Sequence, residues 1–158
     1  MATLTLQRLI NNGACYKQRE LFRSTFGDSV DLTEEVAEQH YKKFQIDWAA
    51  AAFLLREHFT DYLALTAESY FQHGEVEEAW CRAIEATHMA INNGADETEL
   101  RSLKQAQRDA KRANRVAEDE YERVRALAFV KCFNKQEESV ARGDTNKVNE
   151  DTNNANAD

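Results

Sequence analysis

The segment from Asp96 to Asn134 contains neither proline nor glycine, and this uninterrupted length constrains the fold more than any other feature of the chain. Proline removes an amide donor from a helix, and glycine weakens a helix through its backbone entropy. The whole chain of 158 residues has no proline and only five glycines. Asp96, with Glu99 three residues later, has the spacing of a capping box at a helix N-terminus. We therefore expect one long helix from Asp96 to about Asn134.

Shorter helices are expected before this segment, because apolar stripes alternate with Asn-Gly and Gly stop signals. The first two expected helices cover residues 5–11 and 14–26. A third begins after its cap at Thr33, and a fourth follows its cap at Asp47. Two more cover residues 60–71 and 75–91, and Gly74 separates them. The apolar run that follows Asp47 is expected to be the most buried part of the chain. The sequence predicts an all-α fold: a compact bundle of about six or seven helices with a long C-terminal helix, formed by residues 1–134.

Residues 135–158 have a different composition, with two valines, no aromatic residue and many Asn, Asp and Glu. Such a segment buries too little apolar surface to offset the entropy lost on ordering. We predict a disordered tail over 135–158.

The chain shows no membrane span and no secretory signal, since it has no run of 18 apolar residues and no basic region followed by an apolar one at its start. Its three cysteines, Cys15, Cys81 and Cys132, are isolated and form no CxxC pair. Isolated thiols of this kind are typical of a reducing compartment. The sequence therefore predicts a cytoplasmic protein.

The net charge of −8 is unevenly distributed along the chain. Residues 61–99 contain nine acids and one base, whereas residues 100–134 contain nine bases and five acids. At 100° per residue, six of these bases fall within an arc of about 100° on the long helix. This basic stripe consists of Arg101, Lys104, Arg108, Lys111, Arg112 and Arg115. It is interpreted as a solvated face, as a contact for an acidic protein surface, or as a contact for phosphates.

A row of alanines lies on another side of the same helix: Ala106, Ala110, Ala113 and Ala117 fall within an arc of about 60°. Leu103, Tyr121, Val124 and Ala128 extend this alanine row. Small side chains allow a second helix to approach closely. That helix belongs either to the same chain or to a second copy in a homodimer.

The sequence contains no P-loop, GxGxxG, GxSxG or HExxH motif of the kind that marks common catalytic sites. Glu85-x-x-His88 has the spacing used in carboxylate-bridged di-iron bundles, and Glu78 and Cys81 lie on the same side of that helix. A second Glu-x-x-His is required for such a site, and the chain has none. His40 is interpreted as a core residue. We predict no catalytic residues, no cofactor, no metal site and no enzyme activity.

The segment from Leu9 to Gly27, with Gly13-Ala14-Cys15, Gln18, Phe22 and Phe26-Gly27, resembles a group of uncharacterised bacteriophage and prophage proteins. The similarity continues at Val30, at Thr33 and over residues 44–51, and Glu120-Tyr-Glu-Arg-Val-Arg-Ala126 resembles a unit that recurs in some of them. Separately, residues 70–80 resemble one tetratricopeptide hairpin, whereas a solenoid needs about three.

The resemblance implies a phage accessory protein that acts in the host bacterial cytoplasm, such as an inhibitor in host takeover or anti-defence. With the basic stripe as the binding surface, a host protein is the favoured partner. The alternatives are a nucleic-acid-associated protein that uses the same stripe, and a self-associating structural protein.

Overall fold

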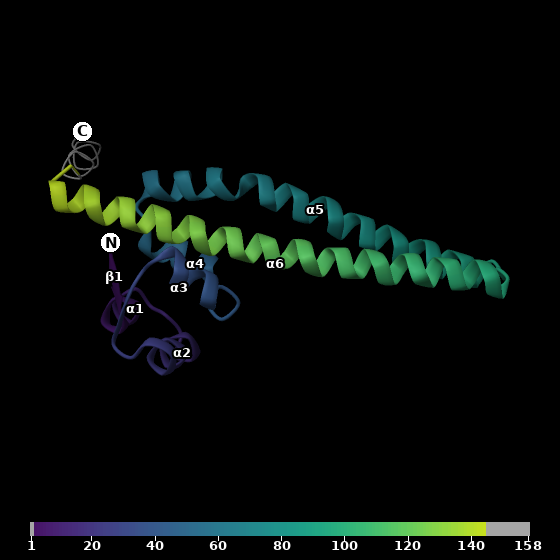
Figure 1. Ribbon diagram of the computed structural model, residues 1–158, viewed down its shortest axis with the longest axis horizontal. Helices are drawn as coiled ribbons and strands as arrows, with labels where there is room; N and C mark the ends of the chain where they lie inside the picture. The colour runs from purple at the N-terminus through teal and green to yellow at the C-terminus, as the bar shows by residue number, and fades with distance from the viewer. Residues whose placement is uncertain (1, 145–158) are drawn as a thin grey trace, which may run out of the picture. The chain divides into compact units, whose positions relative to one another are not determined.

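The computed structural model describes residues 2–144, which form two compact units. The N-terminal unit consists of residues 2–63 and 126–144, and the hairpin unit consists of residues 64–125. The two longest helices, α5 (Arg56–Asn92) and α6 (Glu97–Arg142), contribute to both units (Figure 1). The all-α prediction with a long C-terminal helix is confirmed, with six helices among the described residues.

The N-terminal unit contains four short helices whose starts follow local chemistry. These are α1 (Leu6–Asn11), α2 (Tyr16–Phe26), α3 (Glu34–His40) and α4 (Ile46–Phe53). The hydroxyls of Thr5 and Thr33 accept bonds from the backbone N–H groups of Arg8 and Val36, each at 3.1 Å, and so cap α1 and α3. The predicted cap at Thr33 is therefore confirmed, whereas α4 begins one residue before Asp47.

Two short strands, β1 (Thr3–Thr5) and β2 (Ser29–Asp31), pair antiparallel, with Leu4 opposite Val30. Three-residue strands carry too few alternations to be recognised from the sequence. Their pairing brings the start of the chain beside the segment that connects α2 to α3.

The core of the N-terminal unit combines these short elements with the last part of α6. Phe133 is fully buried, and its ring lies 6.3 Å from that of Phe53 in α4 and 5.6 Å from that of Phe129. The prediction that the run after Asp47 is the most buried part of the chain is wrong. Ala50, Phe53 and Leu54 are buried, but Ala51 and Leu55 are exposed, and residues 126–133 of α6 contain more buried side chains.

The predicted disordered tail begins too early, because α6 continues to Arg142. The buried side chain of Gln136 donates to the Phe53 carbonyl at 2.9 Å and accepts from the Leu55 N–H at 2.6 Å. Lys135 also pairs with Asp61 at 2.7 Å, and the hydrogen bond from Lys135 lowers the pKa of that carboxyl. Hydrogen bonds and an ion pair therefore hold the end of α6 on the N-terminal unit, although this segment has few apolar side chains to bury. The rest of the predicted tail, 145–158, lies outside the described residues.

In the hairpin unit, residues 64–92 of α5 and 97–125 of α6 are joined by a tight turn. The predicted helix break at Gly74 is wrong, since α5 runs through this residue without interruption. The turn has Gly94 at a φ of 74°, and the Asp96 carboxylate accepts from the N–H groups of Thr98 and Glu99. The predicted cap at Asp96 is confirmed. Within the described residues, no helix is long and apolar enough to cross a membrane.

Candidate interaction surface

The two helices of the hairpin unit pack through a regular seam in which positions alternate at spacings of three and four residues. This hairpin seam comprises Thr66, Ser69, His73, Val76, Trp80, Ala83, Thr87 and Ala90 of α5, with Leu100, Leu103, Gln107, Ala110, Asn114, Ala117, Tyr121 and Val124 of α6, all buried or half-buried. The spacing is that of a coiled coil. The Tyr121 ring lies 5.9 Å from Tyr70 and 5.5 Å from His73, which sets the register of the antiparallel pair.

The hairpin seam mixes apolar side chains with polar and small ones, and its apolar side chains are at most half-buried. Every buried apolar side chain of the described chain belongs to the N-terminal unit, whereas the hairpin unit buries only Thr66, Thr87 and Asn114. The Asn114 Oδ1 and the Trp80 Nε1 atoms are buried without a hydrogen-bond partner among the described residues. An unpaired buried polar atom costs about 1–3 kcal/mol, so these two atoms reduce the stability that the hairpin gains from its half-buried apolar contacts.

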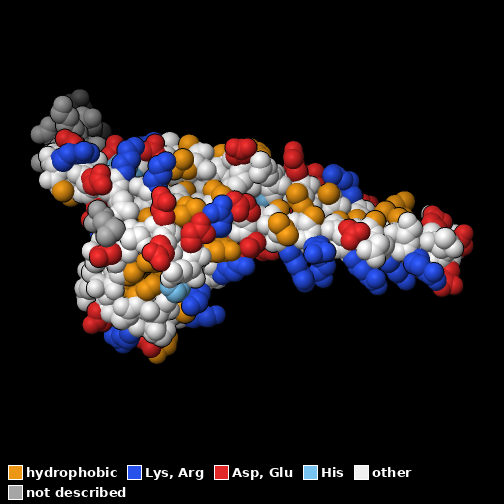
Figure 2. Space-filling view, viewed as in Figure 1, with side chains coloured by type: hydrophobic (Ala, Val, Ile, Leu, Met, Phe, Trp, Pro, Cys, Tyr) orange, Lys and Arg blue, Asp and Glu red, His pale blue; other side chains and the backbone are white. Residues whose placement is uncertain are grey.

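All six residues of the basic stripe are exposed on α6. Figure 2 shows Lys and Arg side chains gathered along one edge of the hairpin. Arg101 pairs with Glu97 one turn earlier at 2.9 Å. The other five bases have no ion-pair partner among residues 2–144. The stripe therefore has positive charge that the described chain does not neutralise locally.

The seam register places the basic stripe beside an apolar edge of α5. Half-buried Ile84 and exposed Ile91 flank the seam on the same side as Lys104 and Lys111, with exposed Cys81 further out. A surface with an aliphatic strip along one border and cations along the other fits an amphipathic partner better than a purely polar one.

The predicted alanine row is divided between two surfaces. Ala110 and Ala117 lie half-buried in the hairpin seam, whereas Ala106 and Ala113 are exposed. Gln107 and Asn114 occupy the seam positions between them. The 100° spacing of a straight helix suggests one row of alanines, but the seven-residue repeat assigns these residues to seam and flank.

The exposed alanines belong to a second apolar surface that sequence reasoning missed. This alanine face consists of Ala79, Ala86 and Met89 of α5 with Ala106, Ala113 and Val116 of α6, all exposed. The register places it on the side of the seam away from Ile84 and Lys111. Its signal in the sequence is the heptad spacing of Ala79 and Ala86 and of Ala106 and Ala113.

The weak metal candidate forms no cluster in the structure. Glu78, Cys81, Glu85 and His88 are all exposed on α5. Residues 2–144 contain no group of three or more His, Cys, Asp or Glu side chains placed to hold a metal ion.

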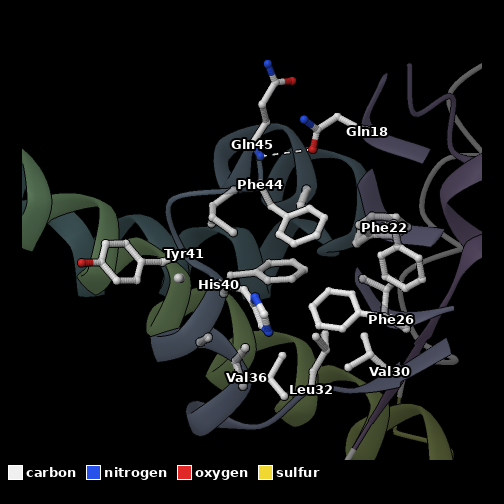
Figure 3. Close-up of a pocket in the computed structure, with 18 of the residues that line it drawn as sticks. Gln18, Phe22, Phe26, Val30, Leu32, Val36, His40, Tyr41, Phe44 and Gln45 are labelled. Atoms are coloured by element: carbon white, nitrogen blue, oxygen red, sulfur yellow. Dashed lines mark hydrogen bonds between the residues drawn. The ribbon is translucent and has the colours of Figure 1, made fainter. Parts of the chain in front are cut away.

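A cavity of about 80 Å³ lies within the N-terminal unit, lined mainly by apolar and aromatic side chains. Figure 3 shows Phe22, Phe26 and Phe44 around it, with the imidazole of His40 close to Phe26. The two rings are 4.9 Å apart, and the buried His40 Nδ1 has no hydrogen-bond partner among the described residues. Burial, assisted by Lys43, lowers the pKa of His40. The site is consistent with the predicted core position of His40, and its volume fits only a small apolar group.

Comparison with known proteins finds no family model, no curated protein and no solved structure that matches the chain. The function proposed below is therefore inferred from the geometry of the molecule itself. The resemblance to bacteriophage proteins stays a prediction from the sequence.

Proposed function

We propose that this protein is a non-enzymatic binding protein whose basic stripe docks on an acidic surface of a second protein. The observation that carries the proposal is the set of six exposed bases, of which only Arg101 has an ion-pair partner within residues 2–144. Cations without an ion-pair partner among the described residues increase the association rate with an acidic partner and help to select it.

The apolar border of the stripe favours a protein over a nucleic acid. Ile84 and Ile91 offer aliphatic contact beside Lys104 and Lys111, which suits an amphipathic helix with an acidic flank. The bases Arg101, Arg108 and Arg115 recur every seven residues, so their Cα atoms are separated by about 10 Å along the axis. The phage origin, the host bacterial protein as partner and the cytoplasmic setting come from the sequence and belong to the same proposal.

The test is a quantitative pull-down from nuclease-treated bacterial lysate with a charge-reversed stripe, Lys104→Glu/Arg108→Glu/Lys111→Glu. The matched control, Lys17→Glu/Lys43→Glu/Lys131→Glu, makes the same change in net charge at exposed lysines of the N-terminal unit. Circular dichroism verifies that both variants keep their helices. We expect the stripe variant to recover about tenfold less of its specific partners than the unaltered protein, or less still, while the control recovers them in the usual amount. Retention of every partner by the stripe variant would show that the stripe is not the binding surface.

Nucleic-acid binding through the same stripe is the alternative, supported by its unpaired charge. It predicts that affinity for a mixed-sequence duplex falls steeply as salt rises, with a log–log slope of roughly five for five phosphate contacts. A protein interface with an aliphatic border loses much less affinity over the same range. A homodimer cannot use the whole alanine row, because Ala110 and Ala117 already pack within the hairpin. Self-association would need a different surface of the chain.

A further inference from the structure

The alanine face is an uncovered apolar surface formed by both helices of the hairpin unit. Met89 and Val116 keep 57% and 65% of their surface exposed, and the four alanines between them are also exposed. The face is flat, because no side chain along its middle is larger than a methyl group. A flat, small-residue surface allows another helical layer to approach closely.

The hairpin unit lacks the core that such a layer would supply. The apolar side chains of its own seam, such as Trp80 and Leu103, are only half-buried, and two buried polar atoms in the seam have no hydrogen-bond partner among the described residues. Two antiparallel helices of this kind correspond to half of a four-helix bundle, whose core forms only when a second pair is added. The missing apolar contact therefore points to an additional pair of helices.

The charges beside the alanine face indicate what those helices are. Counted from the contact of Tyr121 with Tyr70 and His73, Arg82 of α5 lies at the height of Asp109 of α6. Two heptads further along each helix, Glu68 lies at the height of Arg123. These two levels carry opposite charges on the two borders of the same face, and the level between them has Glu75 beside Val116.

We propose that a second copy of this chain packs face to face on the alanine face, with a two-fold axis along the hairpin. This symmetry places α5 of one copy over α6 of the other at unchanged height. Ala79 and Ala86 then lie over Ala113 and Ala106 of the second copy. Arg82 meets Asp109 of the second copy, Glu68 meets Arg123 of the second copy, and both contacts occur twice.

The intermolecular contacts add to local pairs that the single chain already forms. Arg82 lies 3.2 Å from Glu78, and Arg123 lies 2.8 Å from Glu120, whose pKa is lowered mainly by that hydrogen bond. A copy related by this symmetry is favoured over an unrelated acidic partner, because the face borders carry both signs in matched positions. The proposal does not rest on the basic stripe, which lies on the opposite side of the seam.

The first experiment is sedimentation equilibrium of the full chain over a wide concentration range. We expect a species of twice the 18.1 kDa chain mass. Ala113→Glu, which places a charge in the middle of the face, should weaken the dimer by about a hundredfold or more. Ala64→Glu is the matched control, because Ala64 is exposed on α5 away from this face and should leave the dimer unchanged. A monomer at every concentration, or a dimer indifferent to Ala113→Glu, overturns the proposal.

The second experiment tests the symmetry by exchanging charges. Arg82→Asp and Asp109→Arg should each weaken the dimer by roughly tenfold, since each creates two like-charge contacts. The double variant restores opposite charges across the interface and should recover most of that loss. Weakening without recovery overturns the proposed pairing. The charge-reversed stripe variant should still dimerise, so failure of the stripe proposal and failure of this one are separable.

Discussion

At the scale of single residues, polar side chains decide features that apolar patterning leaves open. Gln136 is the clearest case, because its amide satisfies both the carbonyl of Phe53 and the N–H of Leu55 where α4 passes into α5. Gln136→Leu would leave both backbone groups unpaired, so we expect a loss of about 2–4 kcal/mol in the free energy of unfolding. Chemical denaturation measures this loss. Glu138→Leu, at an exposed position on the same helix, should change stability by less than about 0.5 kcal/mol.

His40 gives the N-terminal unit a defined pH response. Burial and then Lys43 lower its pKa below the ordinary value of 6.5, so the unfolded chain binds more protons than the folded chain just below that pH. The stability associated with the neutral form of His40 is fully present above the pKa of the unfolded chain. This stability is lost as the pH falls through the window below 6.5. We expect the free energy of unfolding to decrease between pH 7 and pH 5. His40→Gln should flatten this dependence, and an unchanged slope would contradict the assignment.

At the scale of elements, the helix caps were predictable from the sequence. The lengths of the two long helices and the register between them were less predictable. Thr33 and Asp96 cap as their sequence motifs predict, because these bonds depend on three or four neighbouring residues. The uninterrupted α5, the end of α6 and the strand pair β1–β2 depend on contacts between distant segments. The basic stripe was predictable because charged side chains stay exposed. The division of the alanine row was not predictable. The spacing of a straight helix places Ala106 and Ala110 on one side, whereas the coiled-coil repeat places Ala110 in the seam and Ala106 beside it.

Gly74 tests why α5 does not break. Its backbone is not left-handed, and a Cβ added there would meet nothing within 4 Å. Gly74→Ala should therefore raise the free energy of unfolding of the hairpin by about 0.5–1 kcal/mol through helix propensity and chain entropy. Gly94→Ala is the contrasting variant, because Gly94 has a φ of 74° and alanine there should lower stability by about 1 kcal/mol. Thermal unfolding monitored by circular dichroism distinguishes the two signs.

At the scale of the whole molecule, the two units differ in how they are stabilised. The N-terminal unit contains all buried apolar side chains of the described chain, including Phe22 and Phe133. The hairpin unit depends on helix propensity, on local ion pairs such as Arg123 with Glu120, and on a seam whose apolar side chains are only half-buried. Local ion pairs of this exposed type contribute about 0.5 kcal/mol or less each. The surfaces proposed for binding and self-association therefore both lie on the unit that has no fully buried apolar side chain among the described residues.

This difference predicts that the hairpin opens before the N-terminal unit. In native-state hydrogen exchange, we expect amides of residues 64–92 and 97–125 to exchange through openings of lower free energy than buried amides around Phe22 and Phe133. Asn114→Leu removes an unpaired buried oxygen from the seam and should slow exchange in the hairpin alone. If the second copy packs on the alanine face, raising protein concentration should protect the same amides, because a partner that binds only the folded hairpin stabilises it. Equal protection of both units at low concentration would contradict the division of stability.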